Sequence, residues 1–161
     1  MKRFLLIPLL SMSLFLSGRT FYLSPTGLDT NPGTITEPFY SLNKAWTVIS
    51  AGDTVYMRGG SYKYTSTQFL KGKNGTSNLP INIWAFPGEA PIITRDTDFT
   101  YTWSSGVCLT GNYLHLKGIE ITGFTQENSN IFAGLRVTDS NHNTFEQINS
   151  HHNGHGCVIS G

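Results

Sequence analysis

A short apolar pattern recurs along this 161-residue chain and constrains its fold more than any other feature. Segments with alternating apolar residues begin at positions 54, 80, 106, 134 and 156, in steps of 26, 26, 28 and 22 residues. A repeat with a period of about 25 residues indicates a solenoid, in which each unit stacks on the one before it.

A second set of positions advances in step with the first. Three residues recur 29 positions later: Asn112, Leu116 and Ile119 as Asn141, Phe145 and Ile148. A meander of hairpins has no reason to keep such a phase, whereas stacked coils must keep it. The sequence therefore predicts an all-β fold in which the five repeated segments are the first strands of successive coils.

Side chains alternate between the two faces of a strand, so the repeat also predicts burial. The residues expected in the core are Val55, Met57, Ile81, Ile83, Val107, Leu109, Leu135, Val137, Cys157 and Ile159. Those expected to face outward are Tyr56, Arg58, Asn82, Trp84, Cys108, Thr110, Arg136, Thr138, Val158 and Ser160.

One short helix is predicted before the first coil. Leu42, Trp46 and Ile49 share a helical face between an N-cap at Ser41 and a C′ residue at Gly52. A stack of coils exposes its first core layer and a strand edge, which must be covered. We expect this helix to cap the N-terminal end of the solenoid.

The chain opens like a signal peptide. Lys2 and Arg3 precede an apolar run over residues 4–16, and Gly18 follows it. Pro8 interrupts this run, which is shorter than the roughly 20 residues of a membrane span. The sequence predicts cleavage near residue 18, secretion to the extracellular space or periplasm, and no membrane contact afterwards.

The remaining chain divides into two parts. Residues 19–52 are expected to form an N-terminal strand, a turn-rich loop and the capping helix. Residues 53–161 are expected to form the first four coils and part of a fifth. We expect this chain to be the N-terminal part of a longer protein that is monomeric at full length.

The charge of the chain is nearly balanced, with 11 Lys and Arg against 10 Asp and Glu, so no basic surface for nucleic acid is predicted.

The two cysteines and the histidines receive structural interpretations. Cys108 is predicted to face outward and Cys157 inward, about 10 Å apart across two coils, which is too far for a disulfide. The cluster of His151, His152 and His155 lies in a glycine-containing segment between strands, which favours a turn over a metal site.

Two further polar features also suit turns. Asp29 begins a D-x-N-x-G pattern that resembles a calcium loop but lacks its remaining ligands, so an Asx turn is expected. Asn112 and Asn141 occupy equivalent turns and are predicted to form an amide ladder.

The candidate substrate-binding residues are Tyr56, Arg58, Trp84 and Arg136. Placed in one frame, they form a single outward column of aromatic and guanidinium groups. Aromatic faces stack on sugar rings, and an Arg fork holds a carboxylate with two hydrogen bonds. The column therefore predicts an acidic polysaccharide as partner, although scattered surface aromatics are also ordinary.

The chain resembles the pectin-lyase-like family of right-handed parallel β-helix proteins. Residues 21–34, 37–39, 41–42 and 51–62 carry the resemblance, and residues 152–156 resemble the family's turn before a coil. The opening is similar to that of the family nine polysaccharide lyases, the pectate lyases. The resemblance implies a right-handed parallel β-helix with a short N-terminal capping helix.

It also implies a secreted polysaccharide lyase that cleaves pectate or a related uronate polymer. In such lyases a Lys removes the C5 proton, while calcium held by several Asp residues neutralises the substrate carboxylate. No Asp-rich turn of that kind precedes Gly161, so the catalytic residues and calcium ligands are expected beyond it, and no metal ligand is assigned within the chain.

Two alternatives remain open at this point. A β-helix glycoside hydrolase needs two carboxylates roughly 5 to 9.5 Å apart, and Asp139 has no evident partner. A non-catalytic β-helix protein that only binds glycan needs neither set of residues.

Overall fold

The computed structural model describes residues 18–100, 105–126 and 132–161. Of the predicted signal peptide only Gly18 is described, so that prediction lies outside the described residues. Among the residues that the structure covers, no helix has the length and apolar character needed to cross a membrane.

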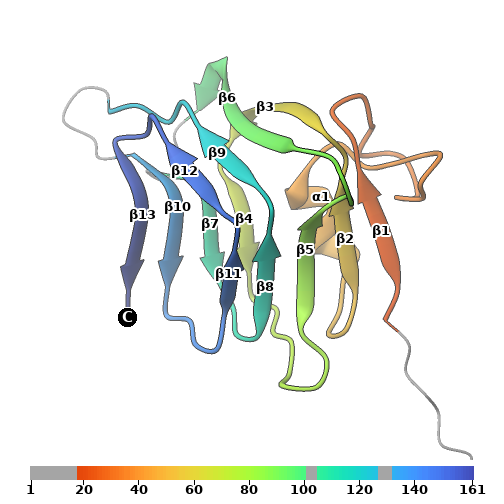
Figure 1. The fold of residues 1–161 in the computed structure, drawn as a ribbon. Coiled ribbons are helices and arrows are strands. Elements are labelled where there is room, and N and C mark those ends of the chain that lie inside the picture. The colour runs from red at the N-terminus through yellow and green to blue at the C-terminus, as the bar shows by residue number, and fades with distance from the viewer. Residues whose placement is uncertain (1–17, 101–104, 127–131) are drawn as a thin grey trace, which may run out of the picture.

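In the described ranges, four coils of three strands each stack along the chain (Figure 1). The first contains β2 (Thr54–Met57), β3 (Gly60–Ser66) and β4 (Gln68–Lys71). The second contains β5 (Ile81–Ala85), β6 (Pro91–Thr100) and β7 (Ser105–Thr110). The third contains β8 (Leu114–Lys117), β9 (Glu120–Thr122) and β10 (Ala133–Thr138). The fourth contains β11 (Thr144–Glu146), β12 (Asn149–His151) and β13 (His155–Ser160).

Successive coils pair strand by strand into three parallel sheets. Sheet A has the order β1-β2-β5-β8-β11, with β1 (Thr20–Leu23) at its N-terminal edge. Sheet B has the order β3-β6-β9-β12, and sheet C has the order β4-β7-β10-β13. Every strand pairing is parallel, which confirms the predicted parallel β-helix.

The predicted phase of the repeat is wrong, although the repeat itself is real. The segments at 54 and 80 form β2 and β5 of sheet A, whereas those at 106, 134 and 156 form β7, β10 and β13 of sheet C. The segment at 156 is therefore the third strand of the fourth coil rather than the first strand of a fifth. The second register is correct, because Leu116 pairs with Phe145 between β8 and β11.

The core-facing residues are buried in all but the last coil. Val55, Ile83 and Leu109 are at most 1% exposed, and the other predicted core residues of the first three coils are also buried. Cys157 and Ile159 hold the predicted register beside Leu135 and Val137. They are nevertheless exposed, Ile159 at 72%, because β13 is the edge strand of sheet C.

The outward assignments fail at two buried positions. Cys108 on β7 is fully buried, and Asn82 on β5 is 8% exposed. A hydrogen bond to the neighbouring strand fixes the Asn82 amide, whose Nδ2 donates to Thr54 Oγ1 at 3.1 Å. Neighbouring side chains on the outer faces of sheets A and C cover these two residues. The alternation of side chains along a strand does not predict such cover.

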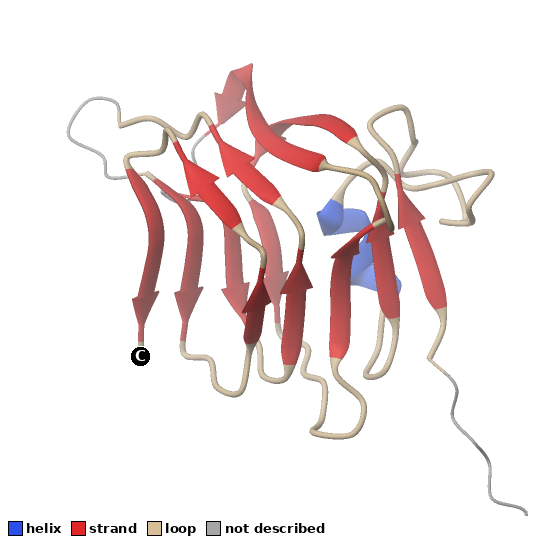
Figure 2. Cartoon of the chain, viewed as in Figure 1, coloured by secondary structure: helices blue, strands red, loops and turns tan. Residues whose placement is uncertain are grey.

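The predicted helix is confirmed as α1 (Leu42–Val48), which packs against β4 behind sheet A (Figure 2). Ser41 is its N-cap, and the Ser41 Oγ accepts a 3.0 Å hydrogen bond from the Lys44 N–H. Leu42, Trp46 and Ile49 are buried, and Trp46 Nε1 donates to the Lys71 carbonyl. The helix thus covers the β4 edge of sheet C.

The helix ends earlier than predicted, with Ile49 as its C-cap. Gly52 lies in the following turn, where its φ of 86° is in the left-handed region. It is not the C′ residue that the sequence suggested.

Asp29 anchors the start of the same helix. Its Oδ1 accepts from the N–H groups of Tyr40 and Ser41, and its Oδ2 accepts from the Ser41 hydroxyl at 2.6 Å. Both carboxylate oxygens are therefore occupied by the chain itself, so the role is structural. The donors lie 11 and 12 residues away, so these bonds do not form the Asx turn that the sequence predicts.

The asparagine ladder exists, but its hydrogen bonds differ from the prediction. The Asn141 N–H donates to Asn112 Oδ1 at 2.7 Å, and the Asn112 N–H donates to Asn74 Oδ1 at 2.8 Å. Each step therefore joins a side chain to the backbone of the next coil, rather than joining two amide side chains.

Candidate carbohydrate-binding faces

Three aromatic residues lie in one line across the outer face of sheet A. Tyr22 pairs in register with Tyr56, and Tyr56 with Trp84. The ring centroids are 6.0 Å apart at each step. All three rings are partly exposed, because the alternate residues Val55 and Ile83 fill the core. We call Tyr22, Tyr56 and Trp84 the aromatic row.

The row ends at a charged group on the next two strands. Trp84 is in register with Lys117, whose Nζ lies 2.8 Å from Glu146 Oε1. The His115 ring lies 5.3 Å from the Trp84 ring, and His115 Nε2 is 3.2 Å from Glu146 Oε2. The Lys117 hydrogen bond, with a smaller contribution from His115, holds the pKa of Glu146 below its ordinary value.

Arg58 follows the strand of Tyr56, but its guanidinium is already occupied. Its Nε lies 2.9 Å from both Glu89 oxygens, and its Nη2 lies 2.7 Å from Glu89 Oε1. The group also stacks over Phe86, 4.8 Å from the ring centroid. This pairing raises the pKa of Arg58 and lowers that of Glu89. Arg58 therefore binds Glu89 in the β5–β6 turn, and its guanidinium is not available to bind a substrate carboxylate.

Arg136 lies on a different sheet from the other three candidate residues. It is on β10 of sheet C, in register between Cys108 and Val158. The single column predicted from the sequence is therefore wrong: Tyr56, Arg58 and Trp84 belong to the sheet A side, and Arg136 belongs to sheet C. The error follows directly from the misassigned phase of the repeat.

The outer face of sheet C is cationic around Arg136. The Arg136 Nε is buried and has no hydrogen-bond partner among the described residues. Lys71, on β4 of the same sheet, lies over the Phe69 ring at 4.7 Å. We call the surface around Lys71 and Arg136 the basic face.

Cys108 lies beneath these cations and is not activated by them. Burial raises the pKa of its thiol more than Lys71 and Arg136 lower it. Cys108 and Cys157 are both free in this structure, and β10 lies between their strands.

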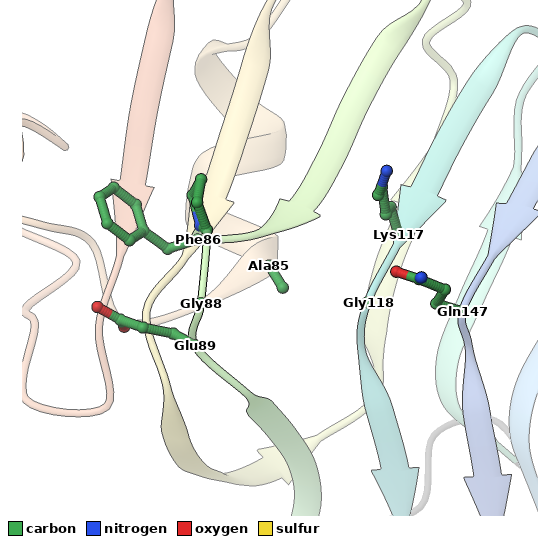
Figure 3. Close-up of a pocket in the computed structure, with 8 residues that line it drawn as sticks. Ala85, Phe86, Gly88, Glu89, Lys117, Gly118 and Gln147 are labelled. Atoms are coloured by element: carbon green, nitrogen blue, oxygen red, sulfur yellow. The ribbon is translucent and has the colours of Figure 1, made fainter.

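A pocket of about 310 Å³ lies beside the aromatic row (Figure 3). It is bounded on one side by the β5–β6 turn with Ala85 and Glu89, and on the other by Lys117, Gly118 and Gln147. Gly118 and Gln147 occupy equivalent turns of successive coils, and both have φ in the left-handed region. Figure 3 shows Phe86 and Glu89 directed away from Lys117 and Gln147.

The histidine cluster spans the predicted turn, but only His152 lies in the turn itself, since His151 and His155 belong to strands. His151 ends β12, residues 152–154 form the turn, and His155 begins β13. His151 Nε2 lies 3.1 Å from Glu120 Oε1 on the preceding coil. Within the described ranges, no three His, Cys, Asp or Glu residues are grouped as metal ligands.

Sequence reasoning missed Tyr22, Phe86 and His115. The sequence predicts Tyr22 only as part of the N-terminal strand within residues 19–52, because β1 lies outside the repeat. The 29-residue register could have placed His115, since it pairs with Thr144 as Leu116 pairs with Phe145. No local signal marks Phe86, which lies in a turn and contacts Arg58 through the fold.

Comparison with known proteins identifies the class that this architecture defines. The profile described as "Pel9A-like, right handed beta helix region" matches residues 21–161. The chain therefore belongs to the Pel9A-like right-handed β-helix family.

Individual relatives agree with this membership. Pectate lyase L of Paenibacillus polymyxa is 32% identical over 139 residues, which cover 86% of this chain and 29% of that protein. A rhamnogalacturonan lyase structure superposes with a TM-score of 0.68 at 29% identity, covering 81% of this chain and 35% of that one. The pectate lyase Pel9A structure gives 0.63 at 24% identity, covering 85% and 34%, which shows the shared fold. The chain thus spans about a third of the length of these relatives.

Proposed function

We propose that this chain is the N-terminal part of a secreted polysaccharide lyase that cleaves pectate or a related uronate polymer by calcium-assisted β-elimination. The observation that carries the proposal is the similarity to pectate lyases, which covers 86% of the chain in the Paenibacillus polymyxa relative. The similarity to a rhamnogalacturonan lyase structure supports the same reaction class.

The reaction sets clear chemical requirements. A base removes the proton at C5 of a uronate, the electron pair forms the C4–C5 double bond, and the glycosidic oxygen at C4 leaves with its half of the chain. The anion that develops beside the carboxylate needs electrostatic stabilisation, which a bound cation supplies. Calcium prefers six to eight oxygen ligands, chiefly carboxylates and carbonyls.

The described residues do not contain such a ligand set, so we place the calcium ligands and the base in coils beyond Gly161. No group of three His, Cys, Asp or Glu residues in the described ranges suits a metal ion. These relatives are about two to three times as long as this chain, which leaves room for further coils. In this proposal the present coils extend the binding surface and carry no part of the proton transfer.

The basic face suits the uronate polymer better than the aromatic row does. The Arg136 side chain is partly exposed, and its Nε has no hydrogen-bond partner among the described residues. A substrate carboxylate at this face would gain a charge-assisted hydrogen bond from the guanidinium. Arg136 is thus the substrate-binding residue that we retain on sheet C.

The decisive assay follows unsaturated products on polygalacturonate. The protein translated from the full reading frame should produce the ultraviolet absorbance of a C4–C5 double bond with calcium and lose it with chelator. The 161-residue chain alone should produce none. New reducing ends without unsaturation would instead establish a glycoside hydrolase, and neither product would leave the non-catalytic glycan-binding alternative.

A further inference from the structure

We propose that the aromatic row on sheet A is a second glycan-binding surface, and that it takes a neutral, equatorially substituted polysaccharide rather than a polyuronate. The ligand class is a β-linked neutral glycan, such as a β-glucan, whose sugar rings present flat C–H faces. This inference does not depend on the lyase activity, because it concerns a different sheet and a different ligand.

The row runs across the strands, and its ring faces are not coplanar: the rings of Tyr22 and Tyr56 are inclined by 27° and those of Tyr56 and Trp84 by 64°. Tyr22, Tyr56 and Trp84 are in register on three neighbouring strands, with two steps of 6.0 Å between ring centroids. At about 4.8 Å per strand the row extends about 10 Å, enough for a short run of sugar rings. Burying C–H faces against partly exposed rings is favourable because it removes apolar surface from water.

The charges around the row argue against an acidic ligand. Arg58 and Lys117 are the cations beside it, and each is paired with a carboxylate: Arg58 with Glu89 at 2.7 Å and Lys117 with Glu146 at 2.8 Å. A uronate carboxylate at this face would have to displace Glu89 or Glu146, or lie beside them. A substrate carboxylate close to the Glu89 or Glu146 carboxylate is repelled, so the row selects against polyuronates.

The hydrogen-bonding groups beside the row suit hydroxyl groups. Lys117 and Gln147 border the adjacent pocket, and His115 touches the Trp84 ring. Trp84 Nε1 is buried and has no hydrogen-bond partner among the described residues, while the ring as a whole remains partly exposed. Neutral sugars combine an apolar ring face with equatorial hydroxyl groups, which matches this combination of surfaces.

Affinity electrophoresis of the 161-residue chain tests the proposal with hydroxyethyl cellulose as the neutral probe and polygalacturonate as the acidic one. The wild type should be retarded by hydroxyethyl cellulose, with little dependence on salt. Trp84→Ala and Tyr56→Ala should each weaken this binding by about fivefold to tenfold. Tyr113→Ala is the matched control, because Tyr113 is an aromatic residue outside the row that stacks on His142.

Trp84→Phe distinguishes a binding role from a structural one, since it keeps an aromatic face and should retain most of the affinity. Circular dichroism verifies the fold of each variant, and Tyr22→Ala on the edge strand β1 replaces any variant that does not fold. Absence of retardation by the neutral probe, or equal retardation of Trp84→Ala and wild type, would overturn the proposal. Retardation by polygalacturonate that Trp84→Ala abolishes would overturn the assignment of a neutral ligand.

Discussion

Trp84 and Lys117 occupy the same register position on β5 and β8, and between them the outer surface of sheet A changes from aromatic to charged. Lys117 does not leave a free cation at this boundary, because Glu146 pairs with it at 2.8 Å. Arg136 is on sheet C, where its Nε has no hydrogen-bond partner within the described part of the chain. The molecule thus presents two outer faces of different chemistry, an aromatic one on sheet A and a cationic one on sheet C.

Asp53 is predicted to be a major stabilising residue at the N-terminal end. Only 4% of its side chain is exposed, and it accepts hydrogen bonds from Arg19 and from the Ser50 N–H. Asp53→Ala leaves these donors without their partner and should lower the free energy of unfolding by about 2 to 3 kcal/mol. Urea denaturation measures the loss, with exposed Glu37→Gln as the control. Equal midpoints for the two variants would contradict this role.

Ser41 should contribute as an N-cap. Ser41→Ala removes both the bond from the Lys44 N–H and the bond to Asp29, so we expect a loss of about 1 to 2 kcal/mol. Ser61→Ala, at an exposed position on β3, should change the unfolding free energy by only a few tenths of a kcal/mol. Thermal unfolding of the two variants makes the comparison, and a Ser41→Ala protein as stable as wild type would refute the capping role.

Asn153 should lock the third coil to the fourth. Its Oδ1 accepts from the Phe124 N–H, and its Nδ2 donates to the Ile121 carbonyl, both at 3.0 Å. Asn153→Ala should cost about 1 to 3 kcal/mol and accelerate hydrogen exchange at the Phe124 amide. Asn141→Ala is the control, because Asn141 contacts the preceding coil through its backbone N–H. The same acceleration in both variants would argue against a specific lock.

The Arg58–Glu89 pair predicts a pH dependence of stability. Hydrogen bonds from Arg58 and from the Gly59 N–H lower the pKa of Glu89 below its ordinary 4.5. Because the folded-state pKa lies below the unfolded value, the pair stabilises the protein above about pH 4.5, and this contribution is lost as the pH falls through the folded-state pKa. Both side chains are partly exposed, so solvent screening keeps this contribution small.

Glu89→Gln tests this dependence by urea unfolding at neutral and acidic pH. The variant should be less stable than wild type at pH 7, and the difference should shrink as the solution is acidified. A difference that stays constant with pH would show that Glu89 acts through packing rather than charge.

The solenoid could be predicted from the sequence because stacking imposes a common phase on distant segments. The assignment of strands to sheets could not. Val55 and Met57 on sheet A alternate in the same way as Leu135 and Val137 on sheet C, so an apolar-x-apolar pattern does not reveal which sheet holds it. The predicted phase slips once, between the segments at 80 and 106, which are β5 and β7 of the same coil rather than equivalent strands of two coils.

The candidate site was predicted in part for the same reason. Tyr56 and Trp84 were correctly matched, because both lie in sheet A and 28 residues separate them. Arg136 was wrongly placed beside them through the phase error. The pairing of Arg58 depends on Glu89 in a turn 31 residues away, and no periodic signal marks that contact.

Binding of polygalacturonate by the 161-residue chain, compared between wild type and Arg136 variants, tests most directly whether this part of the protein recognises a uronate polymer. The account predicts that polygalacturonate retards the wild type in native gels. It also predicts binding about fivefold weaker in Arg136→Ala and intermediate in Arg136→Lys, which keeps the charge but loses the planar fork. Wild type that migrates unretarded, or Arg136→Ala that binds as tightly as wild type, would contradict the assignment of the basic face to the uronate polymer.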